Sequence, residues 1–514
     1  MTAASPTANP EQRPTVRLAA ALASRPIVIG LILTIIVTLG HFGGSFDSDV
    51  ASQLGIAHRI HDGARLYRDI VEVNPPLWFW MAIPVERLAA LLHVSAANVL
   101  FATLGVIVML SLAATGQLLG HIAPARRTLF LAYAALILAA LPWMHVGQRE
   151  QIVLIGALPY AALAAARREF RPVSPVLAIA IGVGAGLGFA LKHYFLIVPA
   201  ALELWLLACT GSRWRPLRLE TLAMVGVGAA YAAALLVEQN YLIRIVPLVR
   251  LAYGQFGPHS VRFLFNPYVV VAGMIIAFTA VHARLLVGRS SSFAAALFIA
   301  ALGFTATYFI QFKGWPYHTI PMLGCGSLAL AALLAETAFP PRLLRILAPA
   351  LLTLPLVASA SEATHPMPAN RDAIAAVAGL KSGDQVGFLV TDTAIPSTVS
   401  LQYGFRNPSR YNGIWMMHAV VDNELHGDRD PRIATFGRQV VANTVTDFRC
   451  RPPKRIIAER PRPGTRGFDI IAFYDRDPQF RELLSHYRVR SRTSLETYEL
   501  VFPWAQPPPS SCRL

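Results

Sequence analysis

Two acids separated by one residue stand directly after the first apolar segment of the chain. Asp47 and Asp49 open a polar stretch that runs to a Pro-Pro turn at residues 75–76. An ionised side chain at the edge of a membrane segment is costly and therefore indicates a functional role. A carboxylate there can act as a general base, or it can cap the helix that we expect to begin near Val50. The residues themselves leave both roles open for each acid.

Polar turns between later apolar blocks carry cations. Two of the four lysines of the chain lie on such turns. Fixed cations can bind a phosphate leaving group, although a lysine at a helix end can also extend to the interface and Arg149 can pair with Glu150. Acids and cations together favour transfer of a group from an anionic lipid carrier. The candidate phosphate-binding residues are Lys192, Arg149, Lys313 and Arg250, and the candidate substrate contacts are Glu150, Tyr67, Asn74, His193 and His318.

The composition predicts that helices crossing a membrane position these residues. The chain of 514 residues is 54% hydrophobic and 14% charged, whereas soluble domains carry about 25% charged residues. Apolar blocks have the length of a membrane helix, about 20 residues. A further apolar piece, Leu77 to Leu92, is interrupted by Pro84 and is expected to be re-entrant or interfacial. The expected spans are 26–42, 97–119, 127–143, 151–166, 174–191, 194–210, 219–238, 267–283, 292–310, 318–337 and 343–360.

Arginine clusters in alternate loops predict the orientation. With eleven spans, the clusters near residues 126, 168, 215, 284 and 342 fall on one side, together with the N-terminal tail. Such loops are cytoplasmic, and they account for the net charge of +16 without a nucleic-acid partner. The scarcity of lysine among the basic residues suggests a high-GC bacterial codon bias, so we expect a bacterial inner-membrane protein. Its expected parts are a disordered tail (1–25), a membrane domain (26–360) and a periplasmic domain (361–514).

The last 150 residues predict a small soluble α/β domain. Apolar runs at 385–390, 454–458, 468–473 and 497–501 are typical of strands, and 477–487 is typical of a helix. Cys450 and Cys512 lie in this part, where a periplasmic location allows a disulfide between them. Two further expectations concern the membrane surface: the helix 50–62 should lie on it, and Trp143, Trp315 and Tyr317 should form an aromatic belt.

The first loop resembles that of GT-C glycosyltransferases, in particular bacterial members similar to dolichyl-phosphate-mannose protein mannosyltransferases and to the lipid A aminoarabinose transferase. The resemblance rests on the acid pair, Gly63, the segment Leu66-Tyr67-Arg68-Asp69 and the turn Asn74-Pro75-Pro76-Leu77. It implies a catalytic base, for which Asp49 fits best and Asp47 next. Asn74 stands where several members have lysine, which weakens a direct phosphate role there. Lys192 after a glycine-rich span resembles the family's glycine-then-lysine feature.

The resemblance implies an inverting glycosyltransferase that takes its sugar from a polyprenyl-phosphate donor in the lipid bilayer. The acceptor would be an envelope glycan, a lipid or a protein on the periplasmic face. No cofactor is expected because the phosphate leaves already ionised, although two neighbouring acids are compatible with a divalent cation. The alternative function is a transporter or flippase of an envelope lipid-linked glycan. That alternative predicts charged residues near the middle of the membrane and broken helices.

Overall fold

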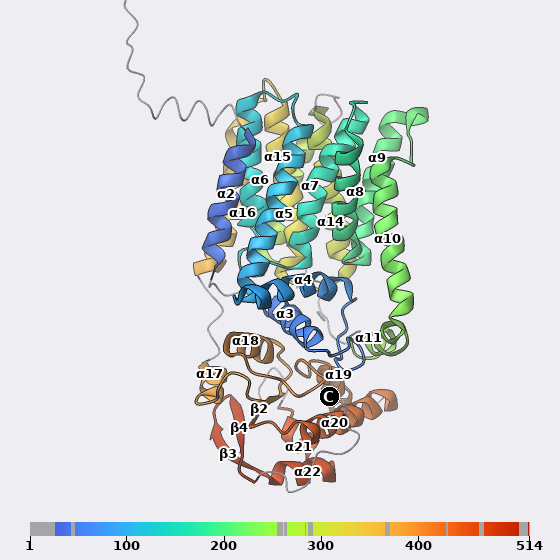
Figure 1. Ribbon diagram of the computed structural model, residues 1–514. Coiled ribbons are helices and arrows are strands. Elements are labelled where there is room, and N and C mark those ends of the chain that lie inside the picture. The colour runs from blue at the N-terminus through green and yellow to red at the C-terminus, as the bar shows by residue number, and fades with distance from the viewer. Residues whose placement is uncertain are drawn as a thin grey trace, which may run out of the picture.

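The protein consists of a helical bundle and a smaller C-terminal domain attached to one end of the bundle (Figure 1). The expected tail, residues 1–25, lies outside the described residues. The computed structural model describes residues 26–42, 47–253, 261, 265–282, 284–285, 291–364, 371–427, 430–461, 467–502 and 512.

Eleven helices of the described chain correspond to the eleven expected spans. Six described helical segments are long and apolar enough to cross a membrane, and three shorter apolar helices accompany them. The chain is therefore a polytopic α-helical membrane protein. The bundle helices are α2 (Pro26–His41), α5 (Ala96–Leu118), α6 (Pro124–Ala139), α7 (Arg149–Arg168), α8 (Pro175–Ala190), α9 (Ile197–Thr210), α10 (Leu219–Val237), α12 (Pro267–Val281), α14 (Ser292–Gln311), α15 (Ile320–Glu336) and α16 (Arg342–Thr364).

Successive bundle helices alternate in direction, so the turns fall into two sets at opposite ends. The turns from α6 to α7, α8 to α9 and α14 to α15 emerge beside the C-terminal domain, at the end that we call the site end (Figure 1). The arginine-bearing turns after α5, α7 and α9 lie at the opposite end. Turns that are far apart in sequence can thus meet at the site end.

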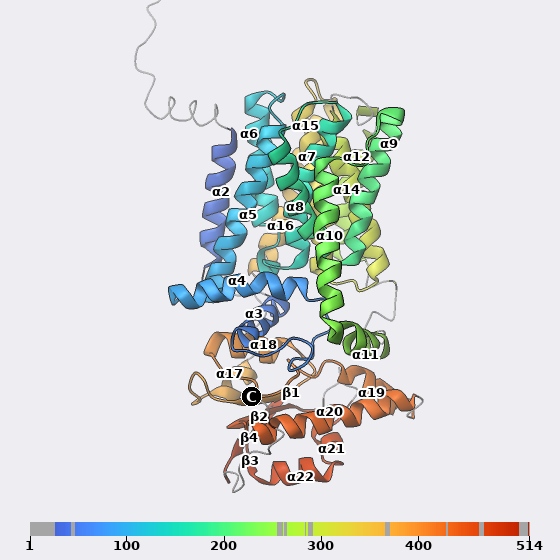
Figure 2. The ribbon, with the colours of Figure 1, turned by 45° about the vertical axis from the view of Figure 1, so that its right-hand side comes forward.

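Two helices of the first loop cover the site end. α4 (Leu77–Leu92) lies across the ends of the bundle helices, and α3 (Ser48–His61) lies between the bundle and the C-terminal domain (Figure 2). Val50, Leu54 and Ala57 of α3 are fully buried, and the helix packs on α4 and on α18 (Ala394–Tyr403). The apolar face that was expected to rest on the membrane surface is therefore covered by protein, because the apolar face of a helix can be buried by protein as well as by lipid.

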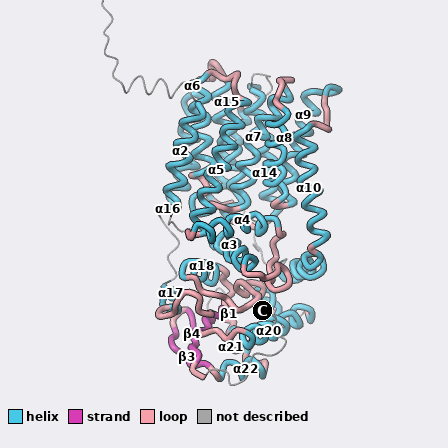
Figure 3. The backbone as a smooth tube through the Cα atoms, in the orientation of Figure 1, coloured by secondary structure: helices cyan, strands magenta, loops and turns pink. Residues whose placement is uncertain are grey.

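The described strands all belong to the C-terminal domain (Figure 3). They are β1 (Val386–Leu389), β2 (Arg455–Glu459), β3 (Tyr487–Arg492) and β4 (Leu495–Leu500), in the spatial order β1-β2-β4-β3. β1 and β2 pair in parallel, and the other two pairs are antiparallel. The helices packed around this sheet are α17 (Arg371–Val377), α18, α19 (Met417–Leu425), α20 (Pro431–Cys450), α21 (Ile470–Tyr474) and α22 (Pro478–Ser485).

The strand expected at residues 468–473 is wrong, since this segment forms the short helix α21. The side chain of Asp469 caps the helix by accepting a hydrogen bond from the backbone amide of Ala472 at 2.9 Å. A short apolar run does not by itself distinguish a strand from a buried helix, so the cap decides the structure here. β3 was not expected, because most of its side chains are exposed and four of its six residues are polar or charged.

Hydrogen bonds and apolar packing hold the C-terminal domain against the first loop and against α11 (Val246–Ala252). The amide of Val71 donates to the carbonyl of Arg410 at 2.8 Å, and Asn412 Nδ2 donates to Ser52 Oγ of α3 at 2.6 Å. Ala252 is buried in the core of the C-terminal domain. A disulfide links Cys450 at the end of α20 to Cys512, with their Cα atoms 5.3 Å apart.

Candidate active site

The two acids of the first loop take different positions at the start of α3. Asp47 is the N-cap, and its Oδ1 accepts a hydrogen bond from the backbone amide of Asp49 at 2.8 Å. Its Oδ2 lies 2.7 Å from Nδ1 of His145. Asp49 lies in the first turn, and its Oδ2 accepts hydrogen bonds from Tyr317 at 3.1 Å and from Gln148 at 3.4 Å. Asp47 therefore caps the helix and holds it to the α6–α7 turn, while Asp49 contacts both that turn, through Gln148, and the α14–α15 turn, through Tyr317.

Burial makes Asp49 a stronger base than an ordinary aspartate. Desolvation raises the pKa of Asp49, and the negative charge of Asp47 raises it further. The positive charge of Arg149 and the hydrogen bonds from Gln148 and Tyr317 act in the opposite sense. A carboxylate whose pKa lies closer to neutrality accepts a proton more effectively. The environment of Asp49 suits a general base.

Arg149 forms the cationic side of the site at the first turn of α7. Its Nη1 donates to Asn74 Oδ1 at 2.6 Å, and its guanidinium lies 4.7 Å from the ring centre of Trp78. Glu72 fixes Asn74 by accepting hydrogen bonds from its backbone amide at 2.9 Å and its side-chain amide at 2.8 Å. Asn74 thus positions Arg149, although it cannot itself neutralise a phosphate. The N-terminus of α7 adds a further partial positive charge.

Lys192 is held inside the protein and does not extend to an interface. Its Nζ donates to Glu150 Oε1 at 2.5 Å, to Gln311 Oε1 at 3.2 Å and to His318 Nε2 at 3.1 Å. Burial lowers the pKa of Lys192 to about 8, and the charge of Glu150 opposes this shift. Arg149 and Glu150 do not form a local ion pair, because Arg149 bonds to Asn74 and Glu150 bonds to Lys192.

Tyr317 joins the acid to the lysine. Its hydroxyl bonds to Asp49, and Lys192 Nζ lies 5.9 Å from the centre of its ring. The side chain is 6% exposed, so the expectation that Tyr317 belongs to an interfacial belt is wrong. Residues from the first loop and from three later turns therefore form one continuous cluster. We call Asp49, Arg149, Glu150, Lys192, Tyr317 and His318 the site cluster.

Three polar atoms of the site cluster have no hydrogen-bond partner within the described chain. They are Nε of Arg149, Oε2 of Glu150 and Nδ1 of His318, and all three are buried. A buried polar atom without a partner costs about 1–3 kcal/mol. Buried polar atoms in native proteins almost always have a hydrogen-bond partner, and a bound water, ion or ligand can supply one. Their gathering beside Asp49 and Lys192 makes this cluster a candidate site for a polar ligand.

Two glycines allow the first loop to approach the α6–α7 turn. Gly147 has a φ of +92°, and a Cβ atom there would lie 3.0 Å from a methyl group of Val50 in α3. Both the backbone conformation and the close approach favour glycine at this position. Gly63, with a φ of +97°, follows the end of α3 and turns the chain toward Tyr67 and Asn74.

The other expected site residues lie at different distances from the cluster. Tyr67 supports the Pro-Pro turn through a hydrogen bond of 2.6 Å from its hydroxyl to the carbonyl of Asn74. Nζ of Lys313 lies 4.1 Å from the ring centre of Tyr253, and burial lowers the pKa of Lys313. His193 and Arg250 are exposed. Neither contributes a hydrogen bond to the site cluster within the described chain, so the structure does not bring these two residues into the site.

The acids at the site end are arranged for hydrogen bonding more than for holding a cation. Protein donors already occupy both oxygens of Asp47 and one oxygen of Asp49. Within the described chain, the group of side chains spaced like metal ligands is His121, Glu169 and Glu336 at the opposite end. Among the described residues, the acids of the site thus do not present a ready divalent-cation site.

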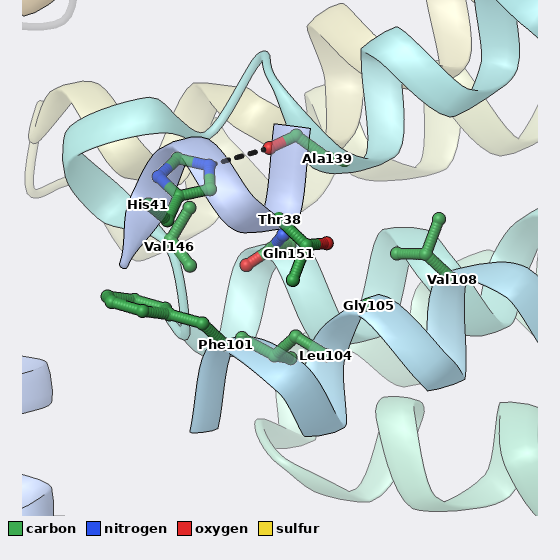
Figure 4. A pocket seen from close by; sticks show the side chains of 9 residues that line it. All are labelled: Thr38, His41, Phe101, Leu104, Gly105, Val108, Ala139, Val146 and Gln151. Carbon is green, nitrogen blue, oxygen red and sulfur yellow. Dashed lines mark hydrogen bonds between the residues drawn. The ribbon is translucent and has the colours of Figure 1, made fainter. Parts of the chain in front are cut away.

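A small cavity lies close to the site but does not include the acids. Thr38 and His41 of α2, Phe101 of α5 and Gln151 of α7 are among its lining residues (Figure 4). His41 Nε2 lies 3.3 Å from the carbonyl of Ala139. No carboxylate, lysine or arginine lines this cavity, so it offers little for binding a phosphate.

The sequence predicts no site role for Gln148, His145, Glu72 or Gln311. All four nevertheless lie on the same turns as the expected site residues. Each contacts an expected residue: Gln148 contacts Asp49, His145 contacts Asp47, Glu72 contacts Asn74, and Gln311 contacts Lys192. The sequence signal that could have identified these four residues is their position close to expected site residues, on turns predicted to lie on the periplasmic side.

Comparison with known proteins adds a distant likeness of overall structure. No protein-family profile and no curated protein matches the sequence. A solved structure of the archaeal oligosaccharyltransferase AglB from Archaeoglobus fulgidus, in complex with an inhibitory peptide and a dolichol-phosphate, aligns with 95% of this chain and 75% of that chain. The identity is 12% and the TM-score is 0.42, values too low to carry an argument about function.

Proposed function

We propose that the protein is a membrane glycosyltransferase that moves a sugar from a polyprenyl-phosphate donor to an acceptor hydroxyl on the periplasmic face. The observation that carries the proposal is the site cluster itself. A half-buried acid with a raised pKa lies near the buried Arg149 and the half-buried Lys192, and all three lie at the end of the bundle opposite the arginine-bearing turns. The resemblance of the first loop to GT-C enzymes supports the same reading.

Asp49 acts as the general base in this proposal, and Asp47 acts as a positioning residue. The acceptor hydroxyl attacks the anomeric carbon while Asp49 takes its proton. The bond between the anomeric carbon and the phosphate oxygen breaks, and its electron pair leaves with the polyprenyl phosphate. A single displacement of this kind inverts the anomeric configuration. Tyr317 and Gln148 hold the carboxylate through its Oδ2.

Arg149 and Lys192 stabilise the departing phosphate. The phosphate gains one negative charge as it leaves, and fixed cations aimed at a developing charge are effective catalysts in a site that excludes water. Arg149 has a buried Nε to offer, and the N-terminus of α7 adds to its field. Glu150 and Gln311 hold the lysine in place until the donor arrives.

The rival function, transport of a lipid-linked glycan, receives less support from the same contacts. A transporter is expected to carry its ionisable residues near the middle of the membrane. The site cluster instead forms from first turns and connecting loops at one end of the bundle. Flipping of a fluorescent lipid-linked sugar across vesicles by the purified protein, without transfer, would favour the rival.

Transfer in proteoliposomes tests the proposal directly. Polyprenyl-phosphate donors carrying radiolabelled mannose or a labelled pentose are supplied with membranes as the source of acceptor. We expect Asp49→Asn to lower transfer by about 100-fold or more, the usual contribution of a general base. Asp47→Asn should lower it less, and Asp69→Asn, which changes an acid paired with Arg65 in the same loop, should have little effect. Undiminished transfer by both Asp49→Asn and Asp47→Asn would refute the proposal.

The donor and the acceptor are tested separately. A comparison of intact envelope glycans, lipids and glycoproteins from cells with and without the protein should reveal one structure that lacks a single terminal sugar. Restoration of that sugar by the wild-type protein, but not by Asp49→Asn, would identify the acceptor. An unchanged set of envelope glycoconjugates would contradict a role in glycosyl transfer.

A further inference from the structure

A second cavity lies in the C-terminal domain, at the sheet edge where the parallel strands β1 and β2 end. Its volume is about 210 Å³. In open sheets with parallel strands, ligands bind outside the carboxyl ends of those strands. The cavity is lined by Glu459, Arg460 and Pro461 at the end of β2, by Thr493, Ser494 and Leu495 between β3 and β4, and by Ile395 of α18.

Glu459 gives this cavity an anionic wall inside the domain. The residue is 5% exposed, and its Oε2 accepts hydrogen bonds from the backbone amide of Thr391 at 2.8 Å and from its hydroxyl at 2.6 Å. Thr391 follows β1, so residues at the ends of both parallel strands fix the carboxylate. An ionised carboxylate is an acceptor-only group with about four acceptor positions. It therefore selects a ligand that carries hydrogen-bond donors.

The rest of the cavity combines fixed polar groups with an apolar wall. Arg460 Nη1 donates to the carbonyl of Thr493 at 3.0 Å, and the amide of Ser494 donates to Asp372 at 3.1 Å. These contacts hold the rim in place before a ligand arrives, which lowers the cost of binding. Ile395 and Leu495 are almost completely buried and supply apolar surface.

The size and chemistry of the cavity point to one ring with hydroxyl groups. Pockets for drug-sized ligands span about 300–1,000 Å³, so a cavity of about 210 Å³ suits a smaller molecule. A pyranose presents C–H groups to an apolar wall and hydroxyl groups to a carboxylate and a guanidinium. We propose that this cavity binds a single sugar unit, with Glu459 accepting a hydroxyl hydrogen and Arg460 donating to a sugar oxygen.

The cavity is separate from the site cluster but shares a supporting element with it. α18 carries Ile395 in its first turn and packs against α3, which bears Asp49. In the views of Figures 1 and 2, α18 lies between α3 and the sheet. Sugar binding in this cavity does not depend on the proposed transfer reaction, so the two proposals can fail independently.

Ligand-observed NMR on the full-length protein in nanodiscs tests the proposal, with methyl α-D-mannopyranoside and methyl β-D-glucopyranoside as probes and cyclohexanol as a ring without sugar hydroxyls. We expect millimolar binding of at least one glycoside and none of cyclohexanol. Ile395→Trp, which fills the cavity, should abolish that binding, and Ile374→Trp on an exposed part of α17 should preserve it.

A second variant keeps the test decisive if Ile395→Trp fails to fold. Glu459→Gln retains the shape of the side chain and should weaken glycoside binding about tenfold, the effect of losing one charge-assisted hydrogen bond. Thermal melts establish that each variant is folded. The proposal is overturned if neither glycoside binds, or if binding is unchanged in the folded Ile395→Trp or Glu459→Gln protein, because the sugar would then occupy another site.

Discussion

Two charged clusters at opposite ends of the bundle differ in how completely their polar atoms are paired. At the opposite end, Arg167 bonds to both carboxylate oxygens of Glu220, at 2.8 and 2.9 Å, and Arg218 bonds to Glu220 and Glu203. None of these four residues is among the described side chains that have a buried polar atom without a partner. We call these four residues the opposite cluster.

The site cluster has similar residue types but incomplete pairing. Arg149, Glu150 and His318 each keep one buried polar atom without a partner. The comparison teaches that charge burial alone does not identify a functional site in this protein. The opposite cluster has its polar atoms paired, whereas the site cluster keeps three buried atoms with hydrogen-bonding capacity for a ligand. Arg126, Arg127 and Arg171 at the opposite end also keep one such atom each, so incomplete pairing identifies a site only together with the acid and the lysine beside it.

The largest expected effect concerns the stability supplied by the opposite cluster. Glu220→Ala leaves two arginines without their shared carboxylate, and breaking a buried ion pair in this way costs about 3–5 kcal/mol. Thermal or denaturant unfolding in detergent measures the loss. Transfer per folded molecule should be retained. Glu482→Ala, which removes an exposed partner of Arg449, should cost less than about 1 kcal/mol. Loss of transfer with normal stability in Glu220→Ala would break the comparison.

The converse substitution belongs to the site cluster. Arg149→Ala should lower kcat/KM for the donor by about 100-fold, since a donor that stabilises a developing negative charge contributes that much. The matched control is Arg168→Ala, because Arg168 also lies over an aromatic ring, that of Trp205 at 5.3 Å. Arg168→Ala should retain transfer per folded molecule. Equal kinetic losses in the two variants would show that Arg149 has no specific role in transfer.

The activity should fall at both high and low pH, because two residues of the site cluster change their protonation state. Lys192, with a pKa of about 8, loses its charge as the pH rises through that value, so kcat/KM for the donor should fall about tenfold per pH unit above it. Asp49 becomes protonated as the pH falls through a value above the ordinary one for aspartate, so activity should also fall on the acidic side.

The alkaline limb is assigned by a substitution that keeps the charge. Lys192→Arg places a guanidinium there, which stays protonated, so the alkaline limb should move to higher pH or disappear. Lys454→Arg, at an exposed pair with Asp384 in the C-terminal domain, should leave the profile unchanged. An alkaline limb that persists in Lys192→Arg would assign it to another group.

The smallest expected effect comes from the hydroxyl that joins the two halves of the site cluster. Tyr317→Phe removes the hydrogen bond to Asp49, and transfer should fall about five- to tenfold, mainly in kcat. That hydrogen bond lowers the pKa of Asp49, so the acidic limb should shift to higher pH. Tyr133→Phe, which removes a hydroxyl bonded to the carbonyl of Leu352 in the bundle, should leave the limb in place.

The charged residues of the candidate site could be identified from the sequence. Asp47, Asp49, Arg149 and Lys192 are unusual for an apolar chain, and their turns fall on one side once the spans are counted. Apolar length and arginine placement predict that arrangement because the bilayer constrains helices strongly. The eleven helices follow the predicted spans closely for the same reason.

The separate roles of Asp47 and Asp49 depend on contacts with residues far away in the sequence, which no local sequence pattern contains. The resemblance of the first loop ranks Asp49 before Asp47 as the base, but their own residue types leave both roles open. The partners His145 and Tyr317 separate the capping residue from the candidate base. Tyr317 looked like a belt residue because aromatic residues at span ends are common at interfaces. Its burial follows from tertiary packing, since its turn packs on α12, α14 and α15 and its hydroxyl bonds to Asp49 of α3.

The sequence by itself determined the membrane architecture and the side on which the charged turns lie, because hydrophobic length and charge asymmetry act along the chain. It did not determine that residues 470–474 form the helix α21, where a single cap outweighs strand propensity. It also did not determine the position of α3, which packs on α4 and α18. The tertiary structure alone decided which acid caps and which faces the cations. Pairing and burial are relations between distant residues, and these relations set the pKa values of Asp49 and Lys192.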